Sequence, residues 1–481
     1  MSVKEFIDRE AELDGLERAW HARDAQLVIL TGRRRVGKSA LLTRFARGKP
    51  IAYVVAAQRL PADQLVDAGH DIAPLAHDFS PGRAPAVRLE RWEDLLDILT
   101  DRSATRRVGL ILDELPYLVA QSPELPSLIQ RWWDRTGSRS NLMLILAGSH
   151  QSVMEQLTSS SGALFGRATW RRQLEPFDYF DAAAFVRSWD PVDRVRAFAV
   201  TGGVPAYLRQ LDASRTLRAN LADLAFTPDG PLFRDAEYLF DAEFREVSRR
   251  GSIFRAMARG ATRPSEIAQA IGLRDAADVQ ANLRDLTALG LVERVVPITD
   301  ELKLRQRHVL YRIKDPYLRF YFTLVDPRRA RIQIGPPEAV VAEIGDTELD
   351  EHVSHVFEDV CSQYVWRSIA AGELPSVERL GRWWRSQDEV DLAGLSRGRL
   401  SLAAEVKWQR QPMDDRDLRL LRDRVRLLDA EADPELLLVS RSGFHASLRR
   451  QAGVRLIGIR DMYASRLGRR GHRMSAASTK G

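Results

Sequence analysis

Residues 32–39 read GRRRVGKS and combine the glycines, lysine and hydroxyl that can bind the phosphates of a nucleotide. The segment has the G-x-x-x-x-G-K-[ST] spacing and lies between the apolar run LVILT and the helix-forming run SALLTRFA. Gly32 and Gly37 allow backbone N–H groups to close around the phosphates. Lys38 can reach the β and γ oxygens, and Ser39 offers a hydroxyl to Mg²⁺. The residues expected to contact ATP are Gly32, Arg33, Arg34, Arg35, Val36, Gly37, Lys38, Ser39 and Ala40.

A phosphate loop of this kind needs a carboxylate from a neighbouring strand to complete a magnesium site. The run VGLILDELPYL offers Asp113 and Glu114 at the end of an apolar strand. We expect Asp113 to bind the same Mg²⁺ as Ser39, and Glu114 to polarise the attacking water. Adjacent acids can also mark a solvated loop, but this strand is too apolar to lie at an edge. The next apolar run ends before Ser149, a candidate sensor of the γ-phosphate, and His150, an expected bystander.

A second group of charged residues lies in DEVDLAGLSRGRLSLAAEVKW, residues 388–408, which predicts two strands joined by a turn at 394–398. Apolar residues alternate along both strands, so each strand is expected to bury one face. These residues are Val390 and Leu392 on one face of the first strand, and Leu402, Ala404, Val406 and Trp408 on one face of the second. The opposite faces carry Asp391, Glu405 and Lys407. Glu405 and Lys407 should lie about 6.6 Å apart along the strand, because each residue rises about 3.3 Å.

The composition is that of a globular protein with more than one core. The chain has 481 residues, 44% hydrophobic and 29% charged, which predicts three or four domains at about 100–200 residues each. Its longest apolar run is too short to cross a bilayer, and its first ten residues lack the apolar segment of a signal peptide. We therefore expect a cytoplasmic protein with no membrane partner. The single cysteine, Cys361, excludes an internal disulfide and a cysteine-cluster metal site, and its apolar neighbours predict a core position.

The net charge of +6 comes from the C-terminal end of the chain. Residues 441–481 contain nine arginines and one lysine against Asp461 alone. Such a segment is either a solvated tail or a surface that binds the phosphate backbone of DNA. The sequence leaves both interpretations open.

Apolar strands that alternate with helical patterns predict a parallel α/β sheet in the first third of the chain. The expected strands are 27–31, 51–55, 108–114 and 142–148. The expected domains are the α/β core at 1–178, a helical lid at 179–245, three helices and a hairpin at 246–325, a linker at 326–345, a mixed α/β domain at 346–465 and a basic tail, expected to be disordered, at 466–481.

The segments GRRRVGKS, LILDELPYL, LMLILAGS, LFGR and GGVPAYL together resemble the archaeal-type AAA+ ATPases, a P-loop NTPase family related to the STAND switch ATPases. The resemblance covers about residues 6–440 and implies that residues 246–325 form a winged-helix domain. It also implies that Arg167 in LFGR is an arginine finger, supplied to the γ-phosphate by a neighbouring subunit of a homo-oligomer. An arginine at a helix start with no catalytic role is the alternative for this position.

The C-terminal domain of that family is similar to the PD-(D/E)XK nuclease fold, an α/β restriction-endonuclease-like domain. Asp391, Glu405 and Lys407 match its acid and E-x-K positions, and Glu358 matches the acid of the preceding helix. The resemblance implies that the three carboxylates hold Mg²⁺ or Mn²⁺ and that Lys407 orients or deprotonates the attacking water. The motif has a proline directly before its first acid, whereas this sequence has Val390 directly before Asp391. A salt-bridged strand pair on a solvated face is the alternative.

The sequence therefore supports two functions. In the first, an ATP-driven switch controls a metal-dependent DNA nuclease. In the second, the ATPase is a regulatory or signalling scaffold whose C-terminal domain binds nucleic acid or protein without cutting it. The would-be recognition helix of the winged-helix segment, 275–290, has three aspartates against one arginine, a balance that phosphates would repel. We expect that segment to serve packing or partner contact rather than DNA binding.

Overall fold

The computed structural model describes residues 6–77, 85–243, 247–303 and 308–464. The chain divides into two compact units, residues 1–176 and residues 177–481, which are described separately. The division follows the hydrophobic cores. Two core clusters lie wholly in the first unit and two lie wholly in the second.

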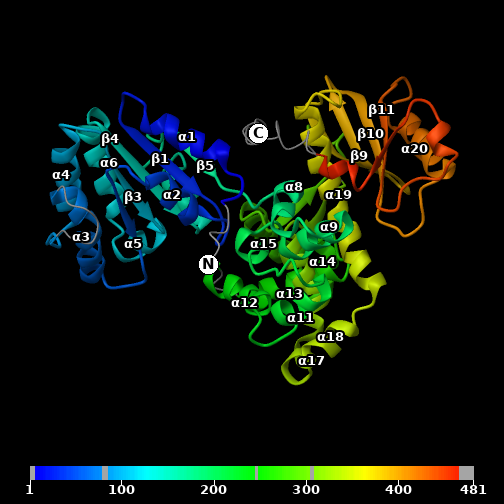
Figure 1. Cartoon of the computed structure of the whole chain (residues 1–481), viewed down its shortest axis with the longest axis horizontal. Helices are drawn as coiled ribbons and strands as arrows, with labels where there is room; N and C mark the ends of the chain where they lie inside the picture. The colour runs from blue at the N-terminus through cyan, green and yellow to red at the C-terminus, as the bar shows by residue number, and fades with distance from the viewer. Residues whose placement is uncertain (1–5, 78–84, 244–246, 304–307, 465–481) are drawn as a thin grey trace. The chain divides into compact units, whose positions relative to one another are not determined.

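The first unit is a five-stranded sheet with the strand order β2-β3-β4-β1-β5, in which every neighbouring pair is parallel (Figure 1). Its strands are β1 (Gln26–Thr31), β2 (Ile51–Val55), β3 (Val108–Asp113), β4 (Leu142–Gly148) and β5 (Trp170–Gln173). Its helices are α1 (Glu10–Trp20), α2 (Lys38–Ala46), α3 (Pro61–His77), α4 (Trp92–Ser103), α5 (Leu115–Gln121), α6 (Leu125–Arg135) and α7 (Gln151–Thr158). The parallel α/β sheet and its four expected strands are confirmed, whereas the short edge strand β5 was not expected.

Helices cover both faces of this sheet, because its central strands are apolar along their whole length. Every residue of β3 and β4 is buried. Along β1, Leu27 and Ile29 pack with α3, α4, α6 and α7, while Val28 and Leu30 pack with α1 and α2 on the other face. This alternation follows the two-residue period of a strand, and it brings the carboxyl ends of β1, β3 and β4 together at one edge.

The second unit begins with helices. They are α8 (Tyr179–Ala182), α9 (Pro191–Thr201), α10 (Pro205–Leu208), α11 (Leu217–Ala225), α12 (Pro231–Glu243), α13 (Val247–Ala258), α14 (Pro264–Ala270) and α15 (Ala276–Ala288). The antiparallel pair β6 (Val292–Val295) and β7 (Leu310–Ile313) follows, as the sequence predicted. The helix at the position of a winged-helix recognition helix is α15, and its Leu283 and Leu286 are buried in the core, which fits the expected packing role.

Residues 326–345 are not an extended linker. They form α17 (Arg329–Ile334) and α18 (Pro337–Ala342), after α16 (Pro316–Phe320) and the π-helical turn η3 (Tyr321–Val325). Ile332, Val340 and Val341 are buried in the same core as the preceding helices. The prolines and arginines of this segment suggested a linker, but its apolar residues recur at helical spacing and pack.

The chain ends in a mixed sheet with the order β12-β11-β10-β9-β8, covered by a helix on each face (Figure 1). Its elements are α19 (Asp346–Ala370), β8 (Arg379–Arg385), β9 (Asp388–Ser396), β10 (Arg399–Lys407), α20 (Asp415–Leu428), β11 (Glu435–Ser440) and β12 (Arg455–Gly458). Strands β8, β9 and β10 are antiparallel neighbours, and β11 and β12 continue parallel to β10. The α19 face belongs to the same core as the helices before it, so the expected separate domains of residues 179–465 share one core.

The two strands expected in residues 388–408 are present, but the expected faces of β9 are wrong. Val390 packs on the α20 side and Leu392 on the α19 side. The cause is an irregularity in the β8–β9 pairing, which steps from Gly381 opposite Ala393 to Trp383 opposite Val390. A bulge inserts a residue and shifts the alternation, which a strict two-residue pattern cannot anticipate.

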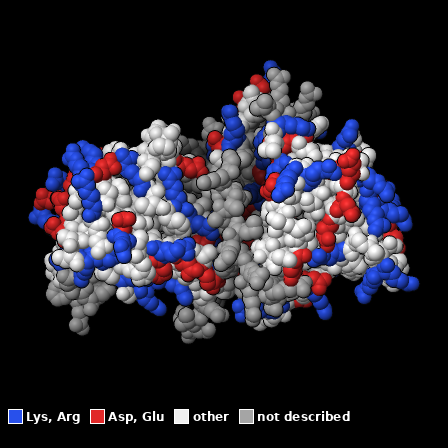
Figure 2. Space-filling view, turned by 90° about the horizontal axis from the view of Figure 1, so that it is seen from above, with Lys and Arg blue, Asp and Glu red and all other residues white. Residues whose placement is uncertain are grey.

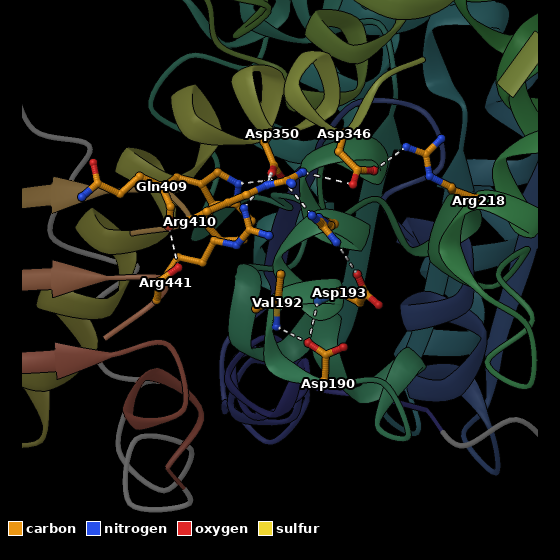
Figure 3. A network of polar contacts seen from close by, with 12 residues as sticks. Asp190, Val192, Asp193, Arg218, Asp346, Asp350, Gln409, Arg410 and Arg441 are labelled. Carbon is orange, nitrogen blue, oxygen red and sulfur yellow. Dashed lines mark hydrogen bonds and ion pairs between the residues drawn. The ribbon is translucent and has the colours of Figure 1, made fainter. Parts of the chain in front are cut away.

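A network of ion pairs ties the C-terminal sheet to the helices within the second unit (Figure 3). Asp350 of α19 accepts hydrogen bonds from Arg196 of α9 and from Arg441 after β11, each at 2.8 Å. Asp346 accepts from Arg218 of α11 at 2.7 Å and from Arg410 after β10 at 3.0 Å. Shared polar contacts of this kind, with the common core, hold these elements together as one unit.

Exposed arginines gather around α20, and Figure 2 shows Lys and Arg side chains on the part of the second unit where Figure 1 places that helix. Part of the basic C-terminal segment is already paired, since Arg441 bonds Asp350 and Arg455 bonds Glu435. The basic tail expected at 466–481 lies outside the described residues. In the described part of the chain, no helix is both long enough and apolar enough to span a membrane. Cys361 is buried, as expected.

Candidate functional site

The phosphate loop follows β1 and leads directly into α2, and its backbone requires two glycines. Gly32 and Gly37 have φ values of 148° and 95°, which side-chain-bearing residues rarely adopt. A Cβ on Gly32 would also stand 2.5 Å from the carbonyl oxygen of Leu174. Arg35 has a φ of 70° without being glycine, so the loop stores some backbone strain.

Lys38 is almost fully buried beneath this loop. Its Nζ donates hydrogen bonds to the carbonyl oxygens of Gly32 at 2.8 Å and Arg33 at 3.3 Å. The loop is held from outside by Arg9, whose guanidinium donates to the carbonyls of Val36 at 3.2 Å and Glu175 at 2.6 Å. Arg9 was missed by the sequence reasoning, because an arginine near the chain start carries no signal that it will meet the loop.

Asp113 ends β3 and lies beside Ser39, as expected. Its Oδ2 accepts hydrogen bonds from Ser39 Oγ and from Tyr53 OH, both at 2.7 Å. Burial raises the pKa of Tyr53 above its usual value, and the hydrogen bond to Asp113 raises it further, so the phenol stays a donor. Tyr53 was also missed, although its position on β2, the strand beside β3, could have suggested it.

Glu114 follows Asp113 in a left-handed conformation with a φ of 56°. Its backbone N–H donates to Asp113 Oδ1 at 3.0 Å, which helps to hold this unusual turn. Its carboxylate oxygen Oε2 accepts from the Ser149 hydroxyl at 2.7 Å and from the Ser149 backbone N–H at 3.1 Å. The structure thus brings together two residues whose roles were predicted separately.

His150 lies next to this pair without bonding to it. Its ring meets Tyr117 edge-on at 5.7 Å, and the Tyr117 hydroxyl accepts a hydrogen bond from Arg34 of the phosphate loop. Burial lowers the pKa of His150, and the positive charge of Arg34 lowers it further. A neutral histidine packed in this way agrees with the expected bystander.

Arg167 is engaged on the surface of its own unit. Its Nε and Nη2 form a bidentate pair with Asp134 of α6, at 2.8 and 2.7 Å, and its Nη1 donates to the Phe165 carbonyl at 2.9 Å. The hydrogen bond from Arg167 lowers the pKa of Asp134. An arginine finger at this position would have to exchange Asp134 for a phosphate.

In the C-terminal sheet, Glu405 of β10 lies at the centre of a compact charge cluster. Its Oε1 is 2.5 Å from Lys407 Nζ, and its Oε2 accepts from Arg424 of α20 at 2.9 Å. Only 4% of the Glu405 side chain is exposed, against 34% of Lys407 and 21% of Arg424, so a buried carboxylate lies under two partly exposed cations. Asp391 of β9 accepts the backbone N–H of Val406 at 2.7 Å.

Burial raises the pKa of Asp391 to about 7, and repulsion by Glu405 adds to the effect. Lys407 acts in the opposite direction, and Glu358 makes only a smaller contribution. Two carboxylates and a lysine thus interact through space across adjacent strands, although the expected alternation of β9 does not hold.

Glu358 of α19 has different partners. Its Oε2 lies 3.0 Å from Arg382 Nη1 and 3.8 Å from Arg312 Nη1. Within the described residues, no three His, Cys, Asp or Glu side chains are grouped closely enough to hold a metal ion. The expected trio of Glu358, Asp391 and Glu405 is therefore not brought together as one ligand set.

The chain matches two protein families. Residues 6–211 match an ATPase domain found predominantly in Archaea. Residues 321–419 match a second family, described as archaeal and bacterial proteins of unknown function. That match includes α19 and the strands that carry Asp391, Glu405 and Lys407.

Similar proteins occur in archaea. An uncharacterized protein of Methanocaldococcus jannaschii is 27% identical over 423 residues, which cover 86% of this chain and 89% of that protein. An uncharacterized ATP-binding protein of the same organism is 50% identical over 46 residues, which cover 10% of this chain and 78% of that protein. Among solved structures, a Walker-type ATPase of Pyrococcus abyssi is 22% identical with a TM-score of 0.47, covering 66% of this chain and 96% of its own.

Proposed function

We propose that this protein is a switch ATPase that binds and hydrolyses ATP at the edge of the first sheet. The observation that carries the proposal is the meeting of the phosphate loop, Asp113 and Glu114 at the carboxyl ends of β1 and β3. Ser39 and Asp113 lie 2.7 Å apart through their oxygens, and Glu114 extends from the next position. The match of residues 6–211 to an ATPase domain family supports the same conclusion.

The Ser39 hydroxyl and the Asp113 carboxylate are the hard oxygen donors that Mg²⁺ prefers, and their contact fits a shared ion. Bound there, Mg²⁺ would neutralise charge on the β- and γ-phosphates. Lys38 would exchange its bonds with the loop carbonyls for phosphate oxygens. The loop N–H groups, held open by Gly32 and Gly37, would bind the phosphates as a nest of donors.

Glu114 is the group that would orient the attacking water and accept its proton. Ser149 holds the Glu114 carboxylate by two hydrogen bonds, so Ser149 can control when that carboxylate faces the water. A γ-phosphate that competes for the Ser149 hydroxyl would release Glu114 for catalysis. Arg167, supplied by a neighbouring copy of the chain, would add a further positive charge once it leaves Asp134.

The loss of ATP binding on removal of Lys38 tests this proposal. Lys38→Ala should weaken ATP binding at least about 100-fold, because the β and γ charges lose their ammonium partner, worth about 3 kcal/mol as a charged hydrogen bond. Lys303→Ala removes a lysine of the other unit and should leave the affinity unchanged. Equal ATP affinity in the wild type and in Lys38→Ala would overturn the assignment of the phosphate loop.

We further propose that the C-terminal sheet is a metal-dependent nuclease domain under the control of the ATPase. The observation that favours it is the cluster of Asp391, Glu405 and Lys407 on adjacent strands. The two carboxylates are suitable donors for Mg²⁺ or Mn²⁺, which would relieve the repulsion between them. Lys407 would orient the water that attacks a phosphodiester. Glu358 would serve as a further ligand only if it left Arg382.

Plasmid cleavage tests this second proposal. The full chain should cut DNA with Mg²⁺ or Mn²⁺, Lys407→Ala should abolish cutting, and Arg426→Ala, at an exposed position of α20, should retain it. Without metal-dependent cutting in the wild type, the nuclease proposal fails. The C-terminal domain would then be assigned to an ATP-dependent scaffold that binds nucleic acid or protein.

A further inference from the structure

The second unit contains a cavity of about 910 Å³, and Glu358 is its one lining residue to which the proposed activities give a role. It is lined by the end of α13, the β6–β7 pair, α16 with η3, one side of α19, and the turn between β8 and β9. Its volume lies within the range of about 300–1,000 Å³ that is typical of small-molecule sites. Asp391, Glu405 and Lys407 are not among its lining residues.

Several side chains that line this cavity contain a buried polar atom with no hydrogen-bond partner. Five atoms have no hydrogen-bond partner among the described residues although their side chains line the cavity: Arg319 Nε, Arg382 Nε, Thr323 Oγ1, His352 Nδ1 and Glu358 Oε2. A folded protein rarely leaves such atoms unpaired, because each costs about 1–3 kcal/mol. Their convergence on one cavity indicates a bound group that supplies the missing partners.

Arg319 is a largely buried cation of this cavity with no ion pair among the described residues, whereas the unpaired Arg259 and Lys314 are exposed. Arg312 pairs with Asp359 at 2.5 Å, and Arg382 lies between Glu358 at 3.0 Å and Glu389 at 2.5 Å. No ion pair to Arg319 occurs within the described ranges.

The charges around Arg319 leave room for an anion. Burial lowers the pKa of Arg319 to about 10, and repulsion by Arg312 lowers it further, while Asp359, Glu358 and Glu351 only partly offset both effects. A guanidinium stays protonated at neutral pH, so this buried charge is a ready anion site.

His352 adds an acceptor to these donors. Its Nε2 lies 3.0 Å from the Ala199 carbonyl oxygen, which can only accept, so Nε2 carries the proton. Burial lowers the pKa of His352 to about 3, which keeps the ring neutral and leaves Nδ1 as a lone-pair acceptor. The cavity therefore offers guanidinium donors, a hydroxyl and an acceptor to one ligand.

We propose that this cavity binds a small phosphate ester of about mononucleotide size, with its phosphate on Arg319 and a donor group of the ligand on His352 Nδ1. The planar guanidinium fork matches phosphate oxygens, and a phosphate has enough oxygens to reach Arg382 and Thr323 as well. The volume accommodates a mononucleotide but not a duplex. The cavity shares Glu358 with the proposed nuclease site, but Arg319, Thr323 and His352 have no role in either proposed activity.

Calorimetric titration of the full chain tests the proposal, in a Lys38→Ala background that disables the phosphate loop. The probes are inorganic phosphate, adenosine monophosphate, adenosine and a 5′-phosphorylated oligonucleotide. We expect both phosphate and the monophosphate to bind and adenosine to bind far more weakly. Adding Arg319→Met should lower the affinity for the monophosphate about 10- to 100-fold, because a charged hydrogen bond is lost.

Two matched variants separate binding from folding. Arg426→Met removes an exposed arginine and should leave the affinity unchanged, and Thr323→Val, which keeps the side-chain shape, should lower it by less than Arg319→Met. Arg319→Met should not lower the thermal midpoint, since the guanidinium has no partner to lose.

Three results would overturn the proposal. The first is no binding of phosphate or monophosphate, which would leave the cavity to water. The second is an equal affinity with and without Arg319. The third is binding of the phosphorylated oligonucleotide but not of the monophosphate, which would assign the site to a nucleic-acid end.

Discussion

The two charged centres of this protein place carboxylates at the ends of buried strands, but they balance the charge differently. Asp113 of the first unit is contacted by the hydroxyls of Ser39 and Tyr53. Glu405 of the second unit is contacted by the cations Lys407 and Arg424. Hydroxyls can satisfy a carboxylate without neutralising it, whereas an ammonium and a guanidinium neutralise it within the chain.

The partners of a carboxylate therefore decide whether it keeps the negative charge that can bind a metal ion. The centre at Asp113 keeps a negative charge that attracts a divalent cation arriving with ATP. Glu405 already has two cationic partners, so a metal there must compete with Lys407 and Arg424. Mutations that remove one partner from each centre should therefore have unequal consequences.

The largest expected effect on stability follows from removing Arg424. Arg424→Met should destabilise the protein by about 2–3 kcal/mol, because buried Glu405 keeps only one of its two cationic partners. Denaturant unfolding measures it. The matched variant Arg426→Met removes an exposed arginine and should cost less than about 0.5 kcal/mol. Equal losses in the two variants would mean that the cluster around Glu405 does not hold the fold.

The next effect is pH-dependent and concerns Asp391. Its pKa is raised to about 7, above the unfolded value of about 3.9, so the unfolded state ionises first as the pH rises. The fold therefore loses stability between about pH 4 and pH 7. Asp391→Asn should remove this loss and stabilise the protein at pH 8 by about 1–3 kcal/mol, with little change at pH 4.

Thermal unfolding of the wild type and Asp391→Asn across this pH range checks the prediction. The amide oxygen can still accept the Val406 N–H, so the variant keeps the local hydrogen bond. A variant less stable than the wild type at pH 8 would show that Lys407 already compensates for the buried charge.

A smaller effect is expected at the first centre. Tyr53→Phe removes one hydroxyl from Asp113 and should destabilise the first unit by about 1 kcal/mol, since Ser39 remains as a donor. Chemical denaturation with and without Mg²⁺ measures it. A loss as large as that of Arg424→Met would erase the contrast between hydroxyl and cation partners.

The sequence predicted the first centre well because its parts are local. The spacing of Gly32, Gly37, Lys38 and Ser39 requires a strand before it and a helix after it, and both are present. Asp113 could be placed because buried parallel strands meet at one edge. The roles of Tyr53 and Arg9 could not be predicted in this way. Their contacts depend on which strand and which chain segment lie beside the site.

The C-terminal centre was harder to predict for the same physical reason. Alternation placed Glu405 and Lys407 correctly on one strand, but the irregularity between Gly381 and Trp383 of β8 puts Val390 on another face of β9 than Leu392. Glu358 was expected to join the acids by resemblance. Glu358 instead pairs with Arg382 of β8. The residue pattern of α19 could not predict this partner, because it comes from another element.

The rate of Mg²⁺-dependent ATP hydrolysis by the full chain and by Glu114→Gln, measured beside ATP binding, tests the central claim most directly. Our account predicts that Glu114→Gln hydrolyses ATP about 10²–10⁴-fold more slowly while its ATP affinity stays close to that of the wild type, because only the water-activating carboxylate is lost. Glu431→Gln, at an exposed acid of the other unit, should hydrolyse ATP normally. Turnover by Glu114→Gln equal to that of the wild type would contradict the assignment of this edge of the sheet as the catalytic centre.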